Sequence, residues 1–164
     1  MKIVPISDRG SLKCRGCDSK DLVSILDLGE QPLPAEYGLR YDDVLDKFPL
    51  HLKVCKNCGL GQLGEYVLPE RIFHETYPYI SSASSYWVNH ATNFAKEMVE
   101  KLSLDKDSLV IELGGNDGYL LSQFQKLGVS VLNVEPPENT AEIARNAGVP
   151  TISEFFGVDL AKRS

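Results

Sequence analysis

The sequence predicts an α/β protein in which a small cysteine-held subdomain precedes the first part of a Rossmann-like domain. Two Cys-x-x-Cys pairs, Cys14 with Cys17 and Cys55 with Cys58, mark the subdomain. An apolar run of Leu109, Val110, Ile111 and Leu113 is typical of a strand buried in a parallel sheet. Three glycines follow it within 114–118, and helical spacing of apolar residues then begins. Strand, glycine loop and helix together open a doubly wound fold.

Length and charge narrow the classes of function. The chain of 164 residues allows one ordinary domain or two small ones. Its formal net charge of −6 argues against affinity gained by phosphate neutralisation, and between residues 11 and 58 seven basic residues face eight acidic ones. No stretch has the length and apolarity of a secretory signal or a membrane span. We therefore expect a cytoplasmic protein without nucleic-acid or membrane partners.

The four cysteines indicate a metal site. Each Cys-x-x-Cys pair can form a tight knuckle, and together Cys14, Cys17, Cys55 and Cys58 offer the four thiolates that structural Zn²⁺ prefers. The 37 residues between the knuckles, 18–54, require a small subdomain to fold between them. Rubredoxin-like iron would fit the same ligands, and four unrelated free thiols are the simplest alternative. We expect zinc that builds structure and does not catalyse.

Short strands should surround the knuckles. Alternation at 22–28 predicts a strand that Gly29 ends, and the prolines of the stretch 31–35 argue against regular structure there. Further strands are expected at 48–54 and 59–63, and Pro69 should open a short helix.

The second half alternates helices and strands. A helix is expected over 85–102, with a core stripe at three- and four-residue spacing from Trp87 to Leu102. After a second strand at 131–134 and a helix stopped by Gly148, a third strand should begin near 149–152. Phe155 and Phe156 are expected to be buried, and a further helix should begin close to the end of the sequence.

The glycine loop has the wrong charge for a dinucleotide. A pyrophosphate needs an uncluttered helix N-terminus, whereas Glu112 and Asp117 flank this turn and would repel it. Two acids suit a ligand with an ammonium and a sulfonium, which describes S-adenosylmethionine. Glu135 follows Gly114 by 21 residues, near the spacing at which such folds bind ribose hydroxyls. Another nucleotide, or a generic βαβ unit with solvated acids, is the competing interpretation.

The ordered set of motifs resembles one enzyme family. Cys14-x-x-Cys17, Leu26-Asp-Leu-Gly-Glu-Gln-Pro-Leu and Phe48-Pro-Leu-x-Leu-x-x-Cys-x-x-Cys-Gly-Leu-x-Gln-Leu are similar to the zinc-binding N-terminal domain of the sugar C-methyltransferases. Tyr77-Pro-Tyr-Ile-Ser-Ser, Glu112-Leu-Gly-Gly-Asn-Asp-Gly and Val134-Glu-Pro-Pro-Glu-Asn continue the resemblance. The sequence departs from the family at Pro34-Ala35-Glu36 and at Gly61.

The resemblance implies methyl transfer from S-adenosylmethionine to the carbon beside the ketone of a nucleotide-linked keto-deoxysugar. Tyr77 and Tyr79 would be catalytic, and the family's general base, a histidine, would lie beyond residue 164. The implied domains are a zinc-binding subdomain (1–66), a connecting segment and helix (67–104) and a partial class I methyltransferase domain (105–164). The expected cofactor-binding residues are Glu112, Gly114, Gly115, Asn116, Asp117, Gly118, Glu135 and Pro136.

Two further expectations concern what this stretch can do alone. After Gly114 only fifty residues remain, enough for two more strands, so the sheet should be incomplete. We expect a fragment of a longer enzyme, or a chain whose exposed half-sheet is covered by another copy, without turnover of its own. The alternative is a zinc-stabilised module that binds a nucleotide or a partner and does not catalyse.

Overall fold

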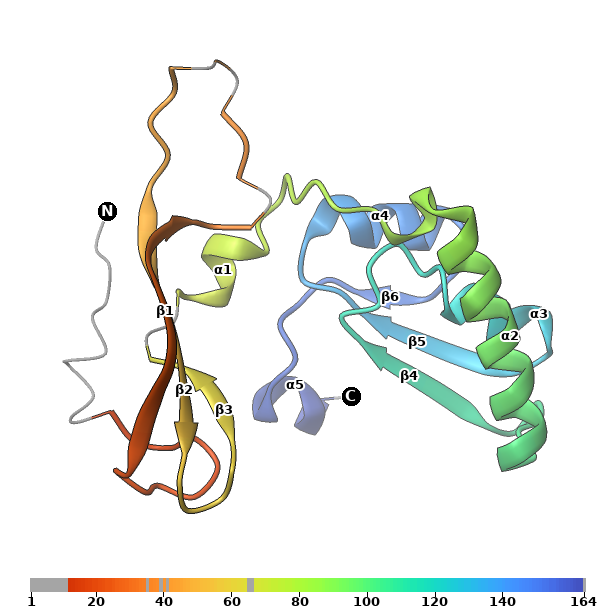
Figure 1. Ribbon diagram of the computed structural model, residues 1–164. Coiled ribbons are helices and arrows are strands. Elements are labelled where there is room, and N and C mark those ends of the chain that lie inside the picture. Colours follow the sequence, from red (N-terminus) through yellow and green to blue (C-terminus); the bar gives the residue numbers. More distant parts are fainter. Residues whose placement is uncertain (1–11, 35, 39, 41, 65–66, 164) are drawn as a thin grey trace. The chain divides into compact units, whose positions relative to one another are not determined.

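The computed structural model describes residues 12–34, 36–38, 40, 42–64 and 67–163. The chain is an α/β protein that divides into two compact units, Met1–Ile72 and Phe73–Ser164 (Figure 1). The expected connecting segment, 67–104, is shared between the units, since its short helix belongs to the first and its long helix to the second. Ala35 and the boundary expected at residue 66 lie outside the described residues.

The first unit is built on an antiparallel sheet of three strands in the order β1-β2-β3. These strands are β1 (Leu22–Pro32), β2 (Lys47–Cys55) and β3 (Gly61–Leu63). The expectation that the first strand ends at Gly29 is wrong, because β1 continues to Pro32, which pairs with Lys47. Gly29 adopts φ +65° at a register irregularity instead. Proline is tolerated at the end of an edge strand because its missing N–H removes no ladder bond there.

A short helix completes the first unit. The helix α1 (Pro69–Ile72) begins at the expected proline. Its Arg71 makes ion pairs with Glu36 and Asp46, so it ties the segment between β1 and β2 to the end of the unit.

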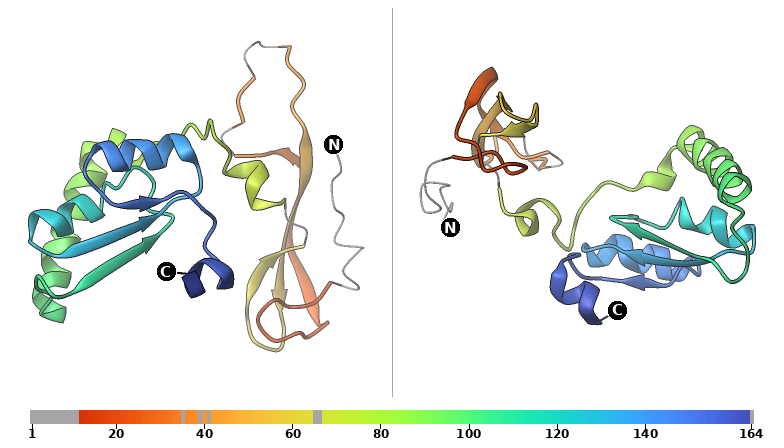
Figure 2. Two further views of the ribbon diagram at one scale, coloured as in Figure 1. Left: turned by 180° about the vertical axis from the view of Figure 1, so that it is seen from behind. Right: turned by 90° about the horizontal axis from the view of Figure 1, so that it is seen from below.

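The second unit contains three parallel strands in the order β4-β5-β6. They are β4 (Leu109–Leu113), β5 (Ser130–Val134) and β6 (Thr151–Ile152). The helices α3 (Leu121–Lys126) and α4 (Glu138–Asn146) connect them. Figure 2 shows α3 beside the long helix α2 (Ser85–Leu102), with which it is in contact. All three strands therefore end at one edge of the sheet, where the loops after β4 and β5 meet.

The core of the second unit joins α2 and α3 to one face of the sheet. Ala95 of α2 packs with Leu121 and Phe124 of α3 and with Val131 of β5. The expected stripe on α2 is correct for Ala91 and Ala95, which are buried. It is wrong for three large residues, since 40% of Trp87, 41% of Phe94 and 61% of Leu102 is exposed. Leu102 is the last residue of the helix, which the left-handed Ser103 ends.

Apolar side chains are exposed on β4 and after β6. Leu109, Ile111 and Leu113, which alternate along β4, are 58%, 51% and 53% exposed, so the expectation of a buried strand is wrong for this face of β4. Phe155 and Phe156 are 39% and 52% exposed, so the expectation that they are buried is wrong. They lie between β6 and the short helix α5 (Val158–Arg163), outside the cluster of buried residues that forms the core.

Within the described ranges, no helix combines the length and the apolarity that crossing a membrane requires.

Candidate functional site

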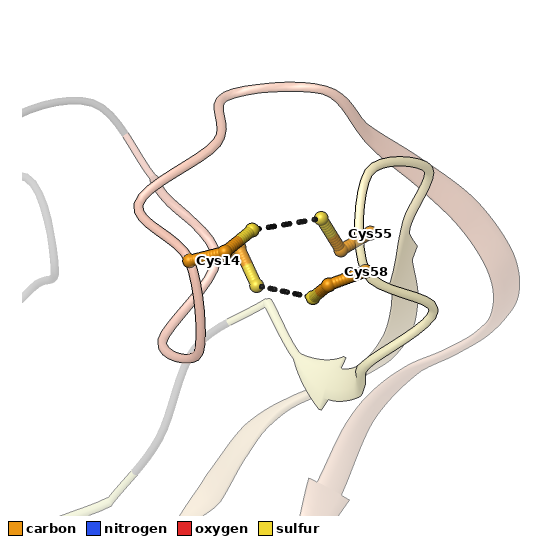
Figure 3. Close-up of side chains that lie close together, drawn as sticks. Cys14, Cys55 and Cys58 are labelled. Atoms are coloured by element: carbon orange, nitrogen blue, oxygen red, sulfur yellow. Dashed lines mark hydrogen bonds between the residues drawn. The ribbon is translucent and has the colours of Figure 1, made fainter.

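The four cysteines form a single cluster. Their sulfur atoms all lie within 4.8 Å of one another. The Sγ atoms of Cys14 and Cys58 are 3.5 Å apart, and those of Cys17 and Cys55 are 3.7 Å apart (Figure 3). Each close pair joins one knuckle to the other, so neither Cys-x-x-Cys motif acts alone.

The two knuckles share one backbone design. The N–H of Asp18 donates to the carbonyl of Cys14, and the N–H of Gly59 donates to the carbonyl of Cys55, both over 2.9 Å. Each donor residue has a left-handed backbone, with φ +58° at Asp18 and +75° at Gly59. These turns direct both sulfurs of a pair to the same side of the chain.

The sulfur positions fit a tetrahedral metal ion. Zn–S bonds of about 2.3 Å in a tetrahedron place neighbouring sulfurs about 3.8 Å apart, close to the separations within the two pairs. Cys14 and Cys55 are buried, while Cys17 and Cys58 are more accessible. Four thiolates leave no coordination position for a substrate, so the donor set suits a structural ion.

The cysteines differ in their ease of ionisation. Hydrogen bonds from the Asn57 side chain and from the backbone of Ser19 lower the pKa of Cys17 to about 6. The backbone hydrogen bond at Leu60 lowers the pKa of Cys58, but the thiols of Cys14 and Cys17 outweigh it and raise that pKa to about 12. Metal binding must therefore release protons from part of the cluster.

Gln62 links the first knuckle to the sheet, a role that the sequence did not indicate. It is buried in β3, where its Oε1 accepts from the N–H of Arg15 over 2.9 Å. Its Nε2 donates to the carbonyl of Lys13 over 3.1 Å. The backbone on both sides of Cys14 is thus held by one side chain. The only signal in the sequence is that Gln62 belongs to the quoted motif Cys58-Gly-Leu-x-Gln-Leu.

A second cluster forms around the glycine loop after β4. Gly114 (φ +79°) donates its N–H to the carbonyl of Val134 over 2.7 Å. The fully buried Asn133 accepts from the N–H of Gly115 over 3.2 Å and donates to the carbonyl of Asn116 over 3.2 Å. A Cβ on Gly115 would lie 2.3 Å from Asn133 Oδ1, so this position requires glycine.

Glu135 reaches back to the same loop. Its Oε2 accepts from the N–H of Asn116 over 2.9 Å, and its Oε1 accepts from the hydroxyl of Thr140 over 2.9 Å. The side chain is only 4% exposed. The carboxylate of Glu135, which follows β5, therefore helps to fix the loop after β4.

Two more carboxylates, those of Glu112 and Asp117, belong to the loop region. Each has one oxygen without a hydrogen-bond partner among the described residues. These oxygens, Glu112 Oε2 and Asp117 Oδ1, are buried. Burial, and then the charges of Glu135 and Asp117, raise the pKa of Glu112 to about 7. Unpaired buried acceptors are unfavourable, so this arrangement fits a ligand that brings positive charge and hydrogen-bond donors.

Residues 77–82, here called the tyrosine segment, are held to the loop through their backbone. The Asn116 side chain donates to the carbonyl of Tyr79 over 3.1 Å and accepts from the N–H of Ser81 over 2.9 Å. Beyond Asn116, further bonds join Asp117 to the N–H of Ser82 (3.0 Å) and Asn139 to the carbonyl of Tyr77 (2.7 Å). Because only backbone atoms of the tyrosine segment are used, the phenols remain available.

Two other residues expected to bind the cofactor, Gly118 and Pro136, make contacts within the protein. Gly118 (φ +77°) lies against Val149, two residues before β6, where a Cβ would be 3.0 Å from Val149 Cγ2. The carbonyl of Pro136 accepts from the hydroxyl of Ser153 over 3.0 Å. The structure thus gathers the loop, Glu135 and the tyrosine segment in one unit. It adds Asn133, which no pattern in the sequence marked, and Asn139, which lies in the quoted motif at 134–139 but was given no role.

Comparison with known proteins agrees with the division of the chain into two units. Residues 14–73 match a family described as "Putative zinc binding domain". Over 152 residues, or 92% of its length, the chain is 30% identical to the C-methyltransferase NovU of Streptomyces niveus. The chain spans 36% of the length of that relative.

These matches confirm the resemblance found in the sequence. The matched family covers both knuckles and the whole of the sheet β1-β2-β3. The similarity to NovU extends over nearly the whole chain, and therefore well beyond the cysteines. Residues 14–73 thus match a family of zinc-binding domains, and the chain is similar to one C-methyltransferase over part of that relative's length.

Proposed function

We propose that this chain is the N-terminal portion of an S-adenosylmethionine-dependent methyltransferase. The enzyme would transfer a methyl group to the carbon beside the ketone of a nucleotide-linked keto-deoxysugar. Support comes from the similarity to a C-methyltransferase and from the motifs shared with the sugar C-methyltransferases. In this proposal the parallel strands β4-β5-β6 are the first part of a Rossmann-like class I methyltransferase domain.

The observation that carries the proposal is the pair of buried, unpaired carboxylate oxygens on Glu112 and Asp117. S-adenosylmethionine offers an ammonium and a sulfonium, both of which attract carboxylates. The pyrophosphate of NAD would instead face these two acids together with Glu135. Coulomb repulsion is strong where water is excluded, so the site favours the cationic ligand over the anionic one.

We assign the methionine end of the ligand to the loop at 112–118 and the ribose to Glu135. Both Glu135 oxygens already accept one hydrogen bond from the protein. A carboxylate oxygen has two lone pairs, so each can still accept a ribose hydroxyl. The bonds to Asn116 and Thr140 would then hold the carboxylate in the orientation that the ribose requires.

The tyrosine segment is proposed to serve the acceptor. S-adenosylmethionine supplies a methyl group already activated on its sulfonium. The acceptor carbon becomes nucleophilic when the proton beside the carbonyl is removed, which leaves charge on the enolate oxygen. Burial, and then the charges of Glu135 and Tyr79, raise the pKa of Tyr77, so this phenol keeps its proton and can donate it in a hydrogen bond. Tyr79 is the second candidate donor.

We further propose that the general base and much of the sugar pocket lie outside these residues. Among the described residues β4 pairs only with β5, and its alternate apolar side chains are exposed. Such a face calls for further polypeptide, either more of the same protein or a second copy. The 164-residue chain should therefore bind the ligand weakly and should not methylate a sugar alone.

The competing proposal is a zinc-stabilised module that binds a nucleotide or a partner without catalysis. The exposed apolar residues of β4 favour it, because such surfaces mark contacts with other chains. The two proposals differ in their ligand: the first requires selective binding of S-adenosylmethionine.

Equilibrium titration with S-adenosylmethionine and, separately, NAD tests the proposed function. We expect measurable binding of the first and none of the second at equal concentration, with calorimetry or ligand-observed NMR as the readout. Equal or stronger binding of NAD would rule out the charge-based assignment. Binding of neither would favour the non-catalytic module.

A further inference from the structure

Asp117 and Asn139 each hold one end of the tyrosine segment through a hydrogen bond to its backbone. Asp117 Oδ2 accepts from the N–H of Ser82 over 3.0 Å, and Asn139 Nδ2 donates to the carbonyl of Tyr77 over 2.7 Å. In each residue the remaining oxygen, Asp117 Oδ1 or Asn139 Oδ1, is buried and has no partner among the described residues. Each residue thus uses one atom to anchor the backbone and has a second atom left over.

The hydrogen bond to Tyr77 decides which atom of Asn139 is left over. A carbonyl oxygen only accepts, so the atom of the amide that contacts it must be the nitrogen. The unpaired atom is therefore an acceptor, and only a donor can satisfy it. The same reasoning fixes Asn116, whose amide contacts a carbonyl with one atom and an N–H with the other.

The surroundings of Asn139 indicate what kind of donor fits. Asn139 lies in the first turn of α4, beside Thr140, whose hydroxyl is 2.9 Å from Glu135 Oε1. It is therefore close in sequence to the end of the site assigned to the ribose. An amide oxygen carries no net charge, so it suits a neutral hydroxyl, whereas Glu112 and Asp117 suit the cationic end of the ligand.

We infer that Asn139 is a further ligand-binding residue, whose Oδ1 accepts a hydrogen bond from a ribose hydroxyl while its Nδ2 holds the carbonyl of Tyr77. This inference rests on the proposed function. It has a consequence for the reaction, because one side chain then contacts both the ligand and the tyrosine segment. Ligand binding should order residues 77–82. In a variant without Asn139, ligand binding should no longer order this segment.

The test compares three variants of the 164-residue chain. Asn139→Ala removes both contacts, and Asn139→Asp keeps an acceptor while replacing the donor to Tyr77. Asn146→Ala is the matched control, because Asn146 is an exposed asparagine at the end of the same helix. S-adenosylhomocysteine is the probe, since it carries the same ribose and cannot transfer a methyl group.

Dissociation constants from ligand-observed NMR give the first readout. Loss of one hydrogen bond should weaken binding of the probe about 3- to 10-fold in Asn139→Ala, and Asn146→Ala should bind like the unmodified chain. With an analogue of the probe that lacks both ribose hydroxyls, the difference between Asn139→Ala and the unmodified chain should disappear. A difference that persists with this analogue would overturn the assignment to a hydroxyl.

Amide hydrogen exchange across residues 77–82 gives the second readout. The probe should slow exchange there in the unmodified chain and should do so much less in Asn139→Ala and Asn139→Asp. Asn139→Asp should nevertheless bind the probe more tightly than Asn139→Ala. If Asn139→Ala does not fold, judged by near-ultraviolet circular dichroism, Asn139→Asp decides through its loss of ligand-dependent protection.

The outcomes separate the inference from the proposed function. If the unmodified chain binds the probe and Asn139→Ala binds it equally well, the inference is overturned and the proposed function stands. If the unmodified chain binds neither the probe nor S-adenosylmethionine even at millimolar concentration, both are overturned. If it binds S-adenosylmethionine alone, the same variants are compared with that ligand.

Discussion

The backbone N–H of Asn116 donates a hydrogen bond to Glu135 Oε2 over 2.9 Å. This contact joins the loop that follows β4 to the acid that follows β5. The Asn116 side chain also holds the tyrosine segment. A change at Glu135 should therefore affect the residues after β5, the loop after β4 and the tyrosine segment.

Replacing Glu135 with alanine should weaken binding of S-adenosylmethionine by about 1–3 kcal/mol, since charge-assisted hydrogen bonds are lost. Calorimetric titration measures the change. Glu142→Ala is the control, because Glu142 is an exposed acid on α4. An unchanged affinity for Glu135→Ala would refute the assignment of the ribose to this residue.

Zinc should bind with a stoichiometry of one ion per chain and should hold the first unit together. A chelator, or Cys55→Ser, should increase hydrogen exchange across residues 12–64 and leave 85–152 protected, because ligand binding and folding are linked. Lys56→Ala is the control, since this exposed residue lies between the two ligands of the second knuckle. Protein prepared without stoichiometric metal that is nevertheless fully folded, or a disulfide between the knuckles, would contradict the site.

Gln62→Ala should destabilise the first unit by about 1–3 kcal/mol, because the backbone groups of Arg15 and Lys13 lose their buried partner. Denaturant unfolding followed by loss of bound zinc measures the effect. Glu30→Ala, an exposed change in β1, should have little effect. Equal stabilities of the two variants would show that Gln62 does not support the knuckle.

Gly115→Ala should destabilise the second unit by about 1–3 kcal/mol or displace the loop, as overpacking does. The added Cβ would meet Asn133 Oδ1 at 2.3 Å and Glu112 Oε2 at 2.9 Å. Gly157→Ala is the matched control, because nothing lies within 4 Å of the position of its Cβ. The thermal unfolding of the two variants checks the prediction, and a similar melting temperature would contradict it.

Glu112 should make both stability and ligand affinity depend on pH. Its pKa is raised from 4.5 to about 7 by burial, and then by the charges of Glu135 and Asp117. The folded state therefore binds a proton that the unfolded state releases, so this contribution to stability is complete below pH 4.5 and is lost as the pH rises toward about 7. A cationic ligand prefers the ionised form, so its affinity should increase as the pH rises through about 7.

Glu112→Gln isolates this effect, because glutamine keeps the shape of the side chain and cannot ionise. The variant should lose the pH dependence of affinity and should be more stable than the unmodified chain above about pH 7. Titrations between about pH 6 and pH 8 measure both quantities. A pH dependence that survives the substitution would assign the proton to another group.

Much of the fold could be predicted because the periodicity is strong. The expected helix at 85–102 and the expected strand at 109–113 have the bounds of α2 and β4. The prediction failed where context outweighs a local rule. Gly29 and Pro32 look like breaks, yet pairing with β2 carries β1 through both. Phe155 and Phe156 were expected in the core because they are large and apolar. Residue type does not reveal the surroundings, and both are exposed.

The metal ligands could be predicted from spacing alone, because Cys-x-x-Cys encodes the turn that presents both sulfurs. The acid-flanked loop was also visible in the sequence. The partners were not, because Asn133, Thr140 and Asn139 act through hydrogen bonds to residues distant in the chain or in a neighbouring element, and such bonds leave no pattern in the sequence. The contacts of the Asn116 side chain with the backbone of Tyr79 and Ser81 were not expected, and its contact with a cofactor stays a prediction.

The most direct measurement of the central claim is a titration of the ¹⁵N-labelled chain with S-adenosylmethionine and with NAD, followed by NMR. The account predicts that S-adenosylmethionine shifts the amide signals of Gly114, Gly115 and Asn116, together with those of Ser81 and Ser82. NAD at the same concentration should leave these signals in place. Shifts of the loop amides by NAD, or signals unchanged by S-adenosylmethionine at millimolar concentration, would contradict the claim that this acid-lined loop binds a cationic methyl donor.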